Sequence, residues 1–358
     1  MASTTIGGGP LAATSELPTF KGRAGWEFTD ISELDLERYE LSTPSHPAPG
    51  AELPGSLWES PATPEREGVT VSVGDEETVV TVARGVDGGT IHLAAVQSAD
   101  GTLVNQRTRI VLQEGAQAEV WEQLLSAEDI DGVFNVNTEL VVGDGAHLRY
   151  VCGQALSEKS WIFGAQRALV GRSGSLDWVA LGFGSHSGHV LMETRLAGEG
   201  ADARVTGAYA TRGRQHIDFD TTQEHAAAHT TSDLAFRGVL QDRSSAVWKG
   251  NIIVDPGAQK TDAFQDSRNL LISKRAHADS IPGLEIQAND VRCTHAAAVA
   301  QVDPEQLFYL RSHGIDETTA KRLVVEGFLA ALVERFPVGP VREVLASALE
   351  QRLALILG

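Results

Sequence analysis

Two side chains near the end of the chain combine residue types that bind transition metals. Cys293 and His295 stand two positions apart in Cys293-Thr294-His295, and in a β-strand such residues project from one face about 7 Å apart. A thiolate and an imidazole both bind first-row metals, but two ligands are too few for a closed tetrahedral site or an ordinary cluster. Any metal bound here would therefore take its other ligands from elsewhere. The alternative is a buried cysteine beside a hydrogen-bonded histidine.

Other residue patterns that could bind a metal or a nucleotide are weaker indications. His225 and His229 have the spacing of a helical metal-binding pair, but they fall among strands, where residues i and i+4 lie about 13 Å apart, too far for one ion. A solvated or hydrogen-bonded pair is the preferred interpretation. The glycine-rich stretch Gly182–Gly188 misses the dinucleotide-binding spacing and opens no helix. No G-x-x-x-x-G-K-S/T sequence occurs, so the chain gives no basis for nucleotide hydrolysis.

The composition narrows the class of protein. The chain has 358 residues, of which 42% are hydrophobic and 22% charged, and this excludes global disorder. A net charge of −19 repels nucleic acid and anionic membranes. No stretch approaches the roughly 18 apolar residues of a membrane span, and Met1–Pro10 lacks the features of a secretory signal. With only two cysteines, we expect a cytoplasmic protein without disulfides.

A repeated turn is the main architectural signal. Short alternating apolar runs flank turns with glycine at positions 115, 145, 174, 200 and 257, with the first gaps being 30, 29 and 26 residues. A period of this order is typical of one structural unit stacked on copies of itself. We therefore predict a mainly β protein with a parallel β-helix or similar solenoid over 67–302. Each turn glycine supplies a positive φ at the corner, and the small residue after it lets successive coils approach.

The two ends differ from this core. Residues 1–20 lack periodicity and are expected to form a mobile lead-in. Residues 21–66 are expected to form an irregular covering segment, in which Thr29 or Asp30 caps at most a short helix before a run of prolines.

A C-terminal helical domain is predicted over 303–358. Asp303 and Pro304 begin a first helix, which Gly314 ends, and Asp316 caps a second helix. Pro337 and Pro340 separate that helix from a third. The third helix has one apolar face, which is expected to pack against its own domain: Leu345, Leu349, Leu353 and Ile356.

Several stretches of the last third resemble the SufB/SufD family of iron–sulfur cluster assembly proteins: Gln259–Gln265, Asn269–Leu271, Ala278–Ile286, Asp290–His295 and Gln306–Ser312. The family's right-handed parallel β-helix with helical ends agrees with the architecture predicted from the turns. Within the family the resemblance favours the SufD branch. SufB-type chains carry a sulfur-handling cysteine where Ser267 stands here, and glutamates where Thr294 and Ala296 stand. Ala296 and His313 depart from the family's usual glycine and arginine.

The resemblance implies a non-enzymatic scaffold subunit that pairs with a SufB-like paralogue and a SufC-like ABC ATPase. His295 and Cys293 match the residues expected at the interface where a nascent cluster forms. Iron or an iron–sulfur cluster would be held transiently in the complex, and no cofactor would be bound tightly by this chain alone. The C-terminal helices are expected to dock the ATPase. Sheet edges near the end of the solenoid are expected to pair with the SufB-like chain, or to form a homodimer when the chain is alone.

Two alternative functions remain at this point. Many β-helices act on polysaccharides, which requires clustered carboxylates; Asp218 and Asp220 share a strand face, but the aligned repeats contain no matching acidic row. A stand-alone metal-binding protein would need more ligands than one Cys/His pair.

Overall fold

The computed structural model describes residues 10–11, 26–48, 50–62, 64–75 and 77–357. Most of the predicted lead-in over 1–20 lies outside the described residues. Pro10 and Leu11 are described, and Leu11 is buried, with its backbone N–H and C=O hydrogen-bonded to the Asn105 side chain at 2.8 and 2.9 Å.

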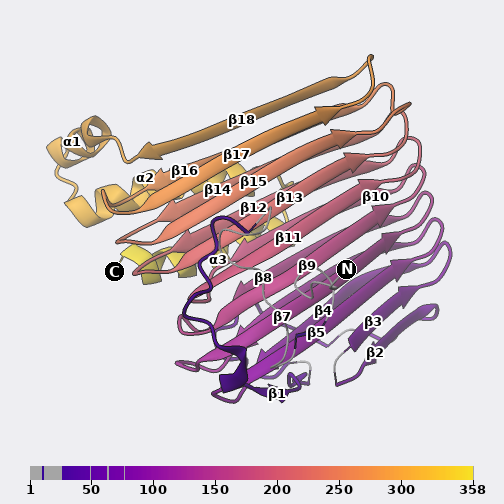
Figure 1. The fold of residues 1–358 in the computed structure, drawn as a ribbon, viewed down its shortest axis with the longest axis horizontal. Helices are drawn as coiled ribbons and strands as arrows, with labels where there is room; N and C mark the ends of the chain where they lie inside the picture. The colour runs from indigo at the N-terminus through magenta and orange to yellow at the C-terminus, as the bar shows by residue number, and fades with distance from the viewer. Residues whose placement is uncertain (1–9, 12–25, 49, 63, 76, 358) are drawn as a thin grey trace.

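Two sheets form the body of the protein (Figure 1). Sheet A has the order β17-β15-β13-β11-β9-β7-β5-β3-β2, with β1 beside β5. Its strands are β1 (Glu40–Ser42), β2 (Val69–Val73), β3 (Glu77–Val82), β5 (Thr102–Leu112), β7 (Gly132–Val142), β9 (Trp161–Val170), β11 (Ser187–Leu196), β13 (His216–His225), β15 (Ser245–Val254) and β17 (His277–Ile286).

Sheet B has the order β18-β16-β14-β12-β10-β8-β6-β4. Its strands are β4 (Asp87–Gln97), β6 (Gln117–Ser126), β8 (His147–Ala155), β10 (Ser175–Gly182), β12 (Asp202–Thr211), β14 (Thr231–Leu240), β16 (Asp262–Leu271) and β18 (Arg292–Gln301).

Successive coils stack in parallel and in register. From β3 to β18 the chain alternates between the two sheets, and each strand pairs in parallel with the strand one coil later. The predicted β-helix is therefore confirmed, with about eight turns. Alternate residues of each strand point between the sheets, where apolar side chains form the main core, among them Phe134, Tyr150, Trp178, Phe236 and Trp248.

One corner of the coil is held by a column of residues in the left-handed conformation: Gly85, Gly115, Gly145, Ser173, Gly200, His229 and Lys260. The backbone N–H of each donates to a carbonyl of the next coil, as Gly115 does to Asp144 at 2.8 Å. The predicted positive φ at Gly174 is wrong, because Ser173 takes that conformation. Gly174 is instead equivalent to Ala146 of the preceding coil. The backbone N–H of Gly174 donates to the Gly171 carbonyl, just as the N–H of Ala146 donates to the Gly143 carbonyl.

From Trp26 to Ser42, the segment before β2 lies on the outer face of sheet A, and further on Leu57 and Trp58 pack against sheet B; the described part is drawn in indigo in Figure 1. Trp26, Leu36 and Tyr39 pack on outward-facing residues of β5, β7 and β9. The predicted helix cap at Thr29 or Asp30 is wrong. The 3-10 helix in this segment (Leu36–Arg38) is capped by Asp35. The Thr29 hydroxyl does not cap a helix and donates to the carboxylate of Asp218, 189 residues away, at 2.7 Å.

Three helices follow the solenoid, as predicted: α1 (Pro304–Ser312), α2 (Glu317–Val333) and α3 (Pro340–Leu357). Pro340 was expected to precede the third helix and is instead its first residue, a position that proline tolerates. Asp303 and Asp316 cap α1 and α2 as expected. The apolar face of α3 is buried against sheet B and α2, as predicted: Leu345, Leu349, Leu353 and Ile356. None of the helices over the described residues is long and apolar enough to cross a membrane.

Candidate functional site at the open end of the solenoid

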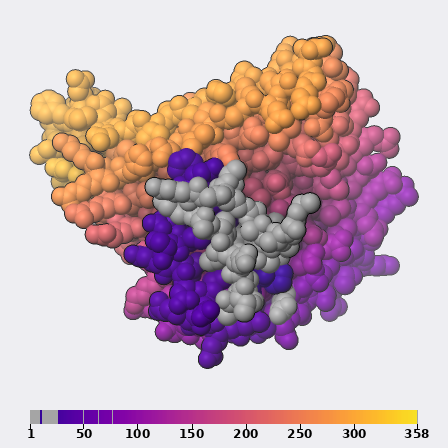
Figure 2. All heavy atoms as spheres, viewed as in Figure 1, coloured from indigo at the N-terminus to yellow at the C-terminus, as the bar shows by residue number. Residues whose placement is uncertain are grey.

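The solenoid ends at β17 and β18, which are the last strands of sheets A and B (Figure 1). Over the described residues, no further strand pairs with the outer edge of either one. Figure 2 shows this region, coloured orange, along one rim of the molecule. Two parallel strand edges therefore present backbone N–H and C=O groups that another chain can pair with.

Cys293 and His295 lie on the face of β18 that points between the sheets. In the strand register, Cys293 is opposite Ala263 and His295 is opposite Gln265, and both of these partners are buried in the interior. The shared strand face inferred from the spacing is thus present in the fold. Cys293 is half-buried, whereas His295 is exposed at the open end.

The thiol of Cys293 sits in a mainly apolar environment. It packs against a cluster that includes Ile252, Val254 and Ala263. Burial, assisted by the negative charge of Asp262, raises the pKa of the Cys293 thiol above its ordinary value. The shift favours the protonated thiol near neutral pH, and a cation or a metal ion beside it would favour the thiolate.

Apolar side chains are exposed on the last two strands of the solenoid. Leu284 and Ile286 of β17 are 38% and 41% exposed, and Val299 of β18 is 42% exposed. Their neighbours one coil earlier, Ile252 and Val254, are fully buried at the equivalent register positions of Leu284 and Ile286. Leu284 and Ile286 are therefore core-type residues of the last coil that no later coil covers over the described residues.

Polar side chains lie one coil beneath the Cys/His pair. Ser267 Oγ lies 3.2 Å from Ser280 Oγ, which also accepts from Asn269 Nδ2 at 3.0 Å. Gln265 Nε2 donates to the Gly250 and Gly283 carbonyls at 3.3 Å each, while its Oε1 has no partner. The sequence does not single out Gln265 as a site residue, because one buried glutamine belongs to no recognisable spacing of functional residues. Ser267 occupies a structural hydrogen-bonding position.

The Cys/His pair is not joined by a third ligand within the described part of the chain. No group of three or more His, Cys, Asp or Glu side chains able to hold a metal ion occurs there. Two coordination positions on a tetrahedral metal would have to be filled from outside these residues. Within these residues, Cys293 and His295 alone therefore do not complete a metal site.

The remaining sequence candidates are occupied by structural contacts. Both ring nitrogens of His225 are hydrogen-bonded, to Thr230 Oγ1 at 2.8 Å and to Ser232 Oγ at 2.9 Å. His229 is one of the corner residues. The Gly182–Gly188 stretch turns the chain from β10 into β11, and a strand follows it.

The two aspartates considered for polysaccharide chemistry are also engaged. The Asp218 carboxylate accepts from Thr29 and lies 3.0 Å from His189 Nδ1, beneath the covering segment. The Asp220 carboxylate pairs with Lys249 at 3.2 Å. Both carboxylates are therefore held by internal partners and are not presented as an open acid–base pair.

Residues 95–328 match the family described as "SUF system FeS cluster assembly, SufBD core domain". The chain belongs to the SufBD family. It is 33% identical to the iron–sulfur cluster assembly protein SufD of Bacillus subtilis over 267 residues, which cover 74% of this chain and 61% of the relative. It is 30% identical to SufD of Escherichia coli over 297 residues, covering 80% and 69%.

A SufBD family protein of Mycobacterium leprae is 32% identical over 287 residues, covering 78% of this chain and 72% of that protein. The SufBD core thus coincides with most of the solenoid and the first helices, and it includes β18 with Cys293 and His295. This chain is a SufD-like member, as the sequence resemblance predicted.

Proposed function

We propose that this SufD-like chain is a non-enzymatic subunit for iron–sulfur cluster assembly, and that it pairs with a SufB-like paralogue through the open end of its β-helix. The observation that carries the proposal is the placement of Cys293 and His295. They share the inward-facing side of the last strand, beside exposed core residues and two unpaired strand edges. A second chain covering this end would bury the apolar side chains and satisfy the strand edges together.

Iron or a nascent cluster is the cargo at this interface. Cys293 and His295 supply a soft thiolate and an imidazole, which suit iron, and the paralogue supplies the remaining ligands. The raised pKa of the Cys293 thiol favours holding the site as a neutral thiol until iron arrives. The cluster is then released to other proteins, so the subunit needs no resident cofactor.

The C-terminal helices are the proposed docking site for a SufC-like ATPase. The apolar face of α3 is already covered by the chain itself, so α1 is the better candidate for the contact. No residue of α1 is buried, and Phe308 and Tyr309 are 75% and 62% exposed. Because α1 follows β18 directly, a pull on this helix would be transmitted to the strand that carries His295.

The deciding experiment uses the complex of this chain with its SufB-like and SufC-like partners. We expect His295→Ala to lower iron and acid-labile sulfide per complex sharply after reconstitution, with normal complex formation. Cys293→Ser should have an equal or smaller effect, and Ser267→Ala little. Thr294→Ala is the matched control, because Thr294 is an exposed neighbour on the other face of β18. Cluster loading of His295→Ala equal to that of Thr294→Ala would show that the histidine is structural.

The chain produced alone is expected to associate through the same open end. Light scattering should show a homodimer that dissociates when the SufB-like partner is added. A monomer whose mass is unchanged by that partner would contradict the proposed pairing.

A further inference from the structure

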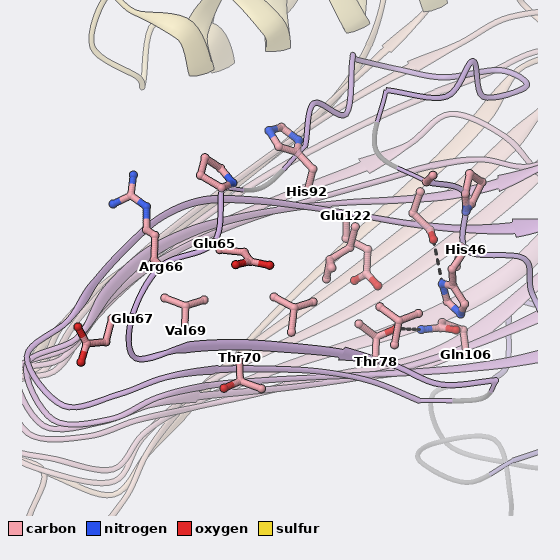
Figure 3. Close-up of a pocket in the computed structure, with 18 residues that line it drawn as sticks. His46, Glu65, Arg66, Glu67, Val69, Thr70, Thr78, His92, Gln106 and Glu122 are labelled. Carbon is pink, nitrogen blue, oxygen red and sulfur yellow. Dashed lines mark hydrogen bonds between the residues drawn. The ribbon is translucent and has the colours of Figure 1, made fainter.

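A cavity of about 880 Å³ lies at the other end of the solenoid, between the first strands and the loop before β2 (Figure 3). This volume is within the range of small-molecule binding sites. Its walls include side chains from β2 to β6 and the loop residue His46. The strand order separates it from Cys293 and His295 by nearly the full length of the stack.

Glu122 provides a buried carboxylate to this cavity. The side chain is on β6 and the residue is 1% exposed. Its carboxylate accepts hydrogen bonds from the Thr108 hydroxyl, at 2.5 Å, and from the Tyr150 hydroxyl. Within the described part of the chain it forms no ion pair with Lys, Arg or His at 4 Å or less. A buried carboxylate without a counter-charge is costly, so it either keeps a proton or meets a cation.

Gln106 adds a second acceptor that has no partner. The residue is 1% exposed and lines the cavity. Its Nε2 donates to the Thr78 and Thr108 hydroxyls at 3.3 Å each and to the Arg107 carbonyl at 3.2 Å. These bonds fix the orientation of the amide, and they leave Oε1 as a buried acceptor that has no partner among the described residues. Such atoms are rare in folded proteins and point to a missing donor.

His46 adds a third acceptor. Its Nδ1 lies 3.0 Å from the Ala94 carbonyl oxygen, so Nδ1 carries the proton and donates. In the neutral ring Nε2 is then an acceptor, and this buried atom has no partner within the part of the chain that the structure describes. Figure 3 shows the ring of His46, the amide of Gln106 and the carboxylate of Glu122 around the same part of the cavity.

The acceptors call for a ligand with several N–H donors and a positive charge. A metal ion is a poorer match, because no group of three or more His, Cys, Asp or Glu side chains with metal-binding geometry occurs over the described residues. Apolar side chains such as Val69 and Leu93 line the same space and suit a short hydrocarbon chain. Two exposed carboxylates, Glu65 and Glu67, also line the cavity, and the exposed Arg66 between them donates to the Asp87 carbonyl at 3.3 Å. Because the two carboxylates outnumber this one guanidinium and the chain carries a net charge of −19, the local and overall charges both attract cations.

We propose that this cavity binds a small aliphatic amine in its ammonium form, with Glu122 as the counter-ion and Gln106 Oε1 and His46 Nε2 accepting its N–H groups. The site is independent of the proposed assembly function, since it lies at the end of the solenoid farthest from His295.

The test is titration calorimetry of the isolated chain near pH 7 with putrescine and with n-butylamine, and 1-butanol serves as the neutral isostere. We expect saturable binding of the amines and none of the alcohol. Glu122→Gln should weaken binding about tenfold or more, the usual effect of losing one hydrogen bond to a charged group. Glu128→Gln, which alters an exposed carboxylate after β6, should bind as the unchanged protein does.

His46→Ala provides a second test that does not risk the fold, because His46 is a half-buried loop residue. It should weaken amine binding while the thermal unfolding temperature of the free chain stays nearly unchanged. No saturable binding of either amine, equal binding of 1-butanol, or an equal loss in Glu128→Gln would each overturn the proposal.

Discussion

The exposed section of core at β17 gives a quantitative test of the proposed pairing with a SufB-like chain. Leu284 and Ile286 are about two-fifths exposed, although the equivalent residues one coil earlier are fully buried. Full burial of such a side chain contributes about 1.5–3 kcal/mol. Covering the exposed remainder therefore contributes about 1 kcal/mol for each, or about 2 kcal/mol for the two.

The double variant Leu284→Ala/Ile286→Ala keeps one methyl group at each position and removes most of this contribution. We expect the Kd for the SufB-like partner to rise about tenfold, which corresponds to about 1.4 kcal/mol. The measurement is biolayer interferometry with the immobilised partner, in which the weakening should come mainly from faster dissociation.

Leu169→Ala is the matched control for the double variant. Leu169 is 44% exposed on the outer face of β9, in the middle of the stack. Leu169→Ala likewise truncates a partly exposed strand leucine, and it does so away from the open end. A change in Kd of less than about twofold for the double variant, or an equal weakening by Leu169→Ala, would refute pairing through the exposed core of β17.

Three further predictions follow from single contacts. Phe308→Ala/Tyr309→Ala should abolish pull-down of the SufC-like ATPase while leaving circular dichroism unchanged, and retained binding would rule out α1 as the dock. Burial lowers the pKa of His225 from 6.5 to about 4 in the folded protein. Between pH 6.5 and pH 4 the imidazole is therefore protonated mainly in the unfolded state, so the free energy of unfolding falls as the pH is lowered. The loss of stability reaches about 3 kcal/mol near pH 4. Urea unfolding at pH 7 and 4.5 should show a smaller loss for His225→Gln, and equal losses would exclude His225 as the cause. A Cβ at Gly188 would lie 1.9 Å from the Ile162 carbonyl oxygen, whereas one at Gly327 meets no atom within 4 Å. Thermal unfolding should therefore show that Gly188→Ala is strongly destabilised and that Gly327→Ala is stabilised by about 0.5–1 kcal/mol. The reverse order would contradict the close contact between coils at Gly188.

The sequence was sufficient for features that depend on local spacing. Turn period revealed the solenoid, and Asp303, Asp316 and Gly314 marked the helix ends, because caps and turns act within a few residues. Corners held by Ser173, His229 and Lys260 were missed, since nothing in their residue types requires a left-handed conformation.

Features that depend on distant contacts were not predictable from spacing. Thr29 has the residue type of a helix cap, but its hydroxyl is bound by Asp218 in the folded protein. The candidate site shows the same division. The pattern Cys293-Thr294-His295 predicted a shared strand face, while the position of that face over Ala263 and Gln265 of the preceding coil follows from coil stacking. Glu122, Gln106 and His46 come from separate segments, and only the stack brings them to one cavity.

The two ends of the stack present different strand edges, and this difference affects how the molecule can assemble. At the start of the stack, β2 runs antiparallel along the edge of β3, and Ser45 bridges to Val96 of β4 through two backbone hydrogen bonds. Over the described residues, a chain added at that end of sheet A would meet an antiparallel strand, whereas β17 and β18 present parallel edges at the other end. Head-to-tail addition, which would generate a filament, is therefore disfavoured, because it would not continue the parallel register of the stack. Joining through the β17 and β18 edges uses that end on both chains, so growth stops at a pair.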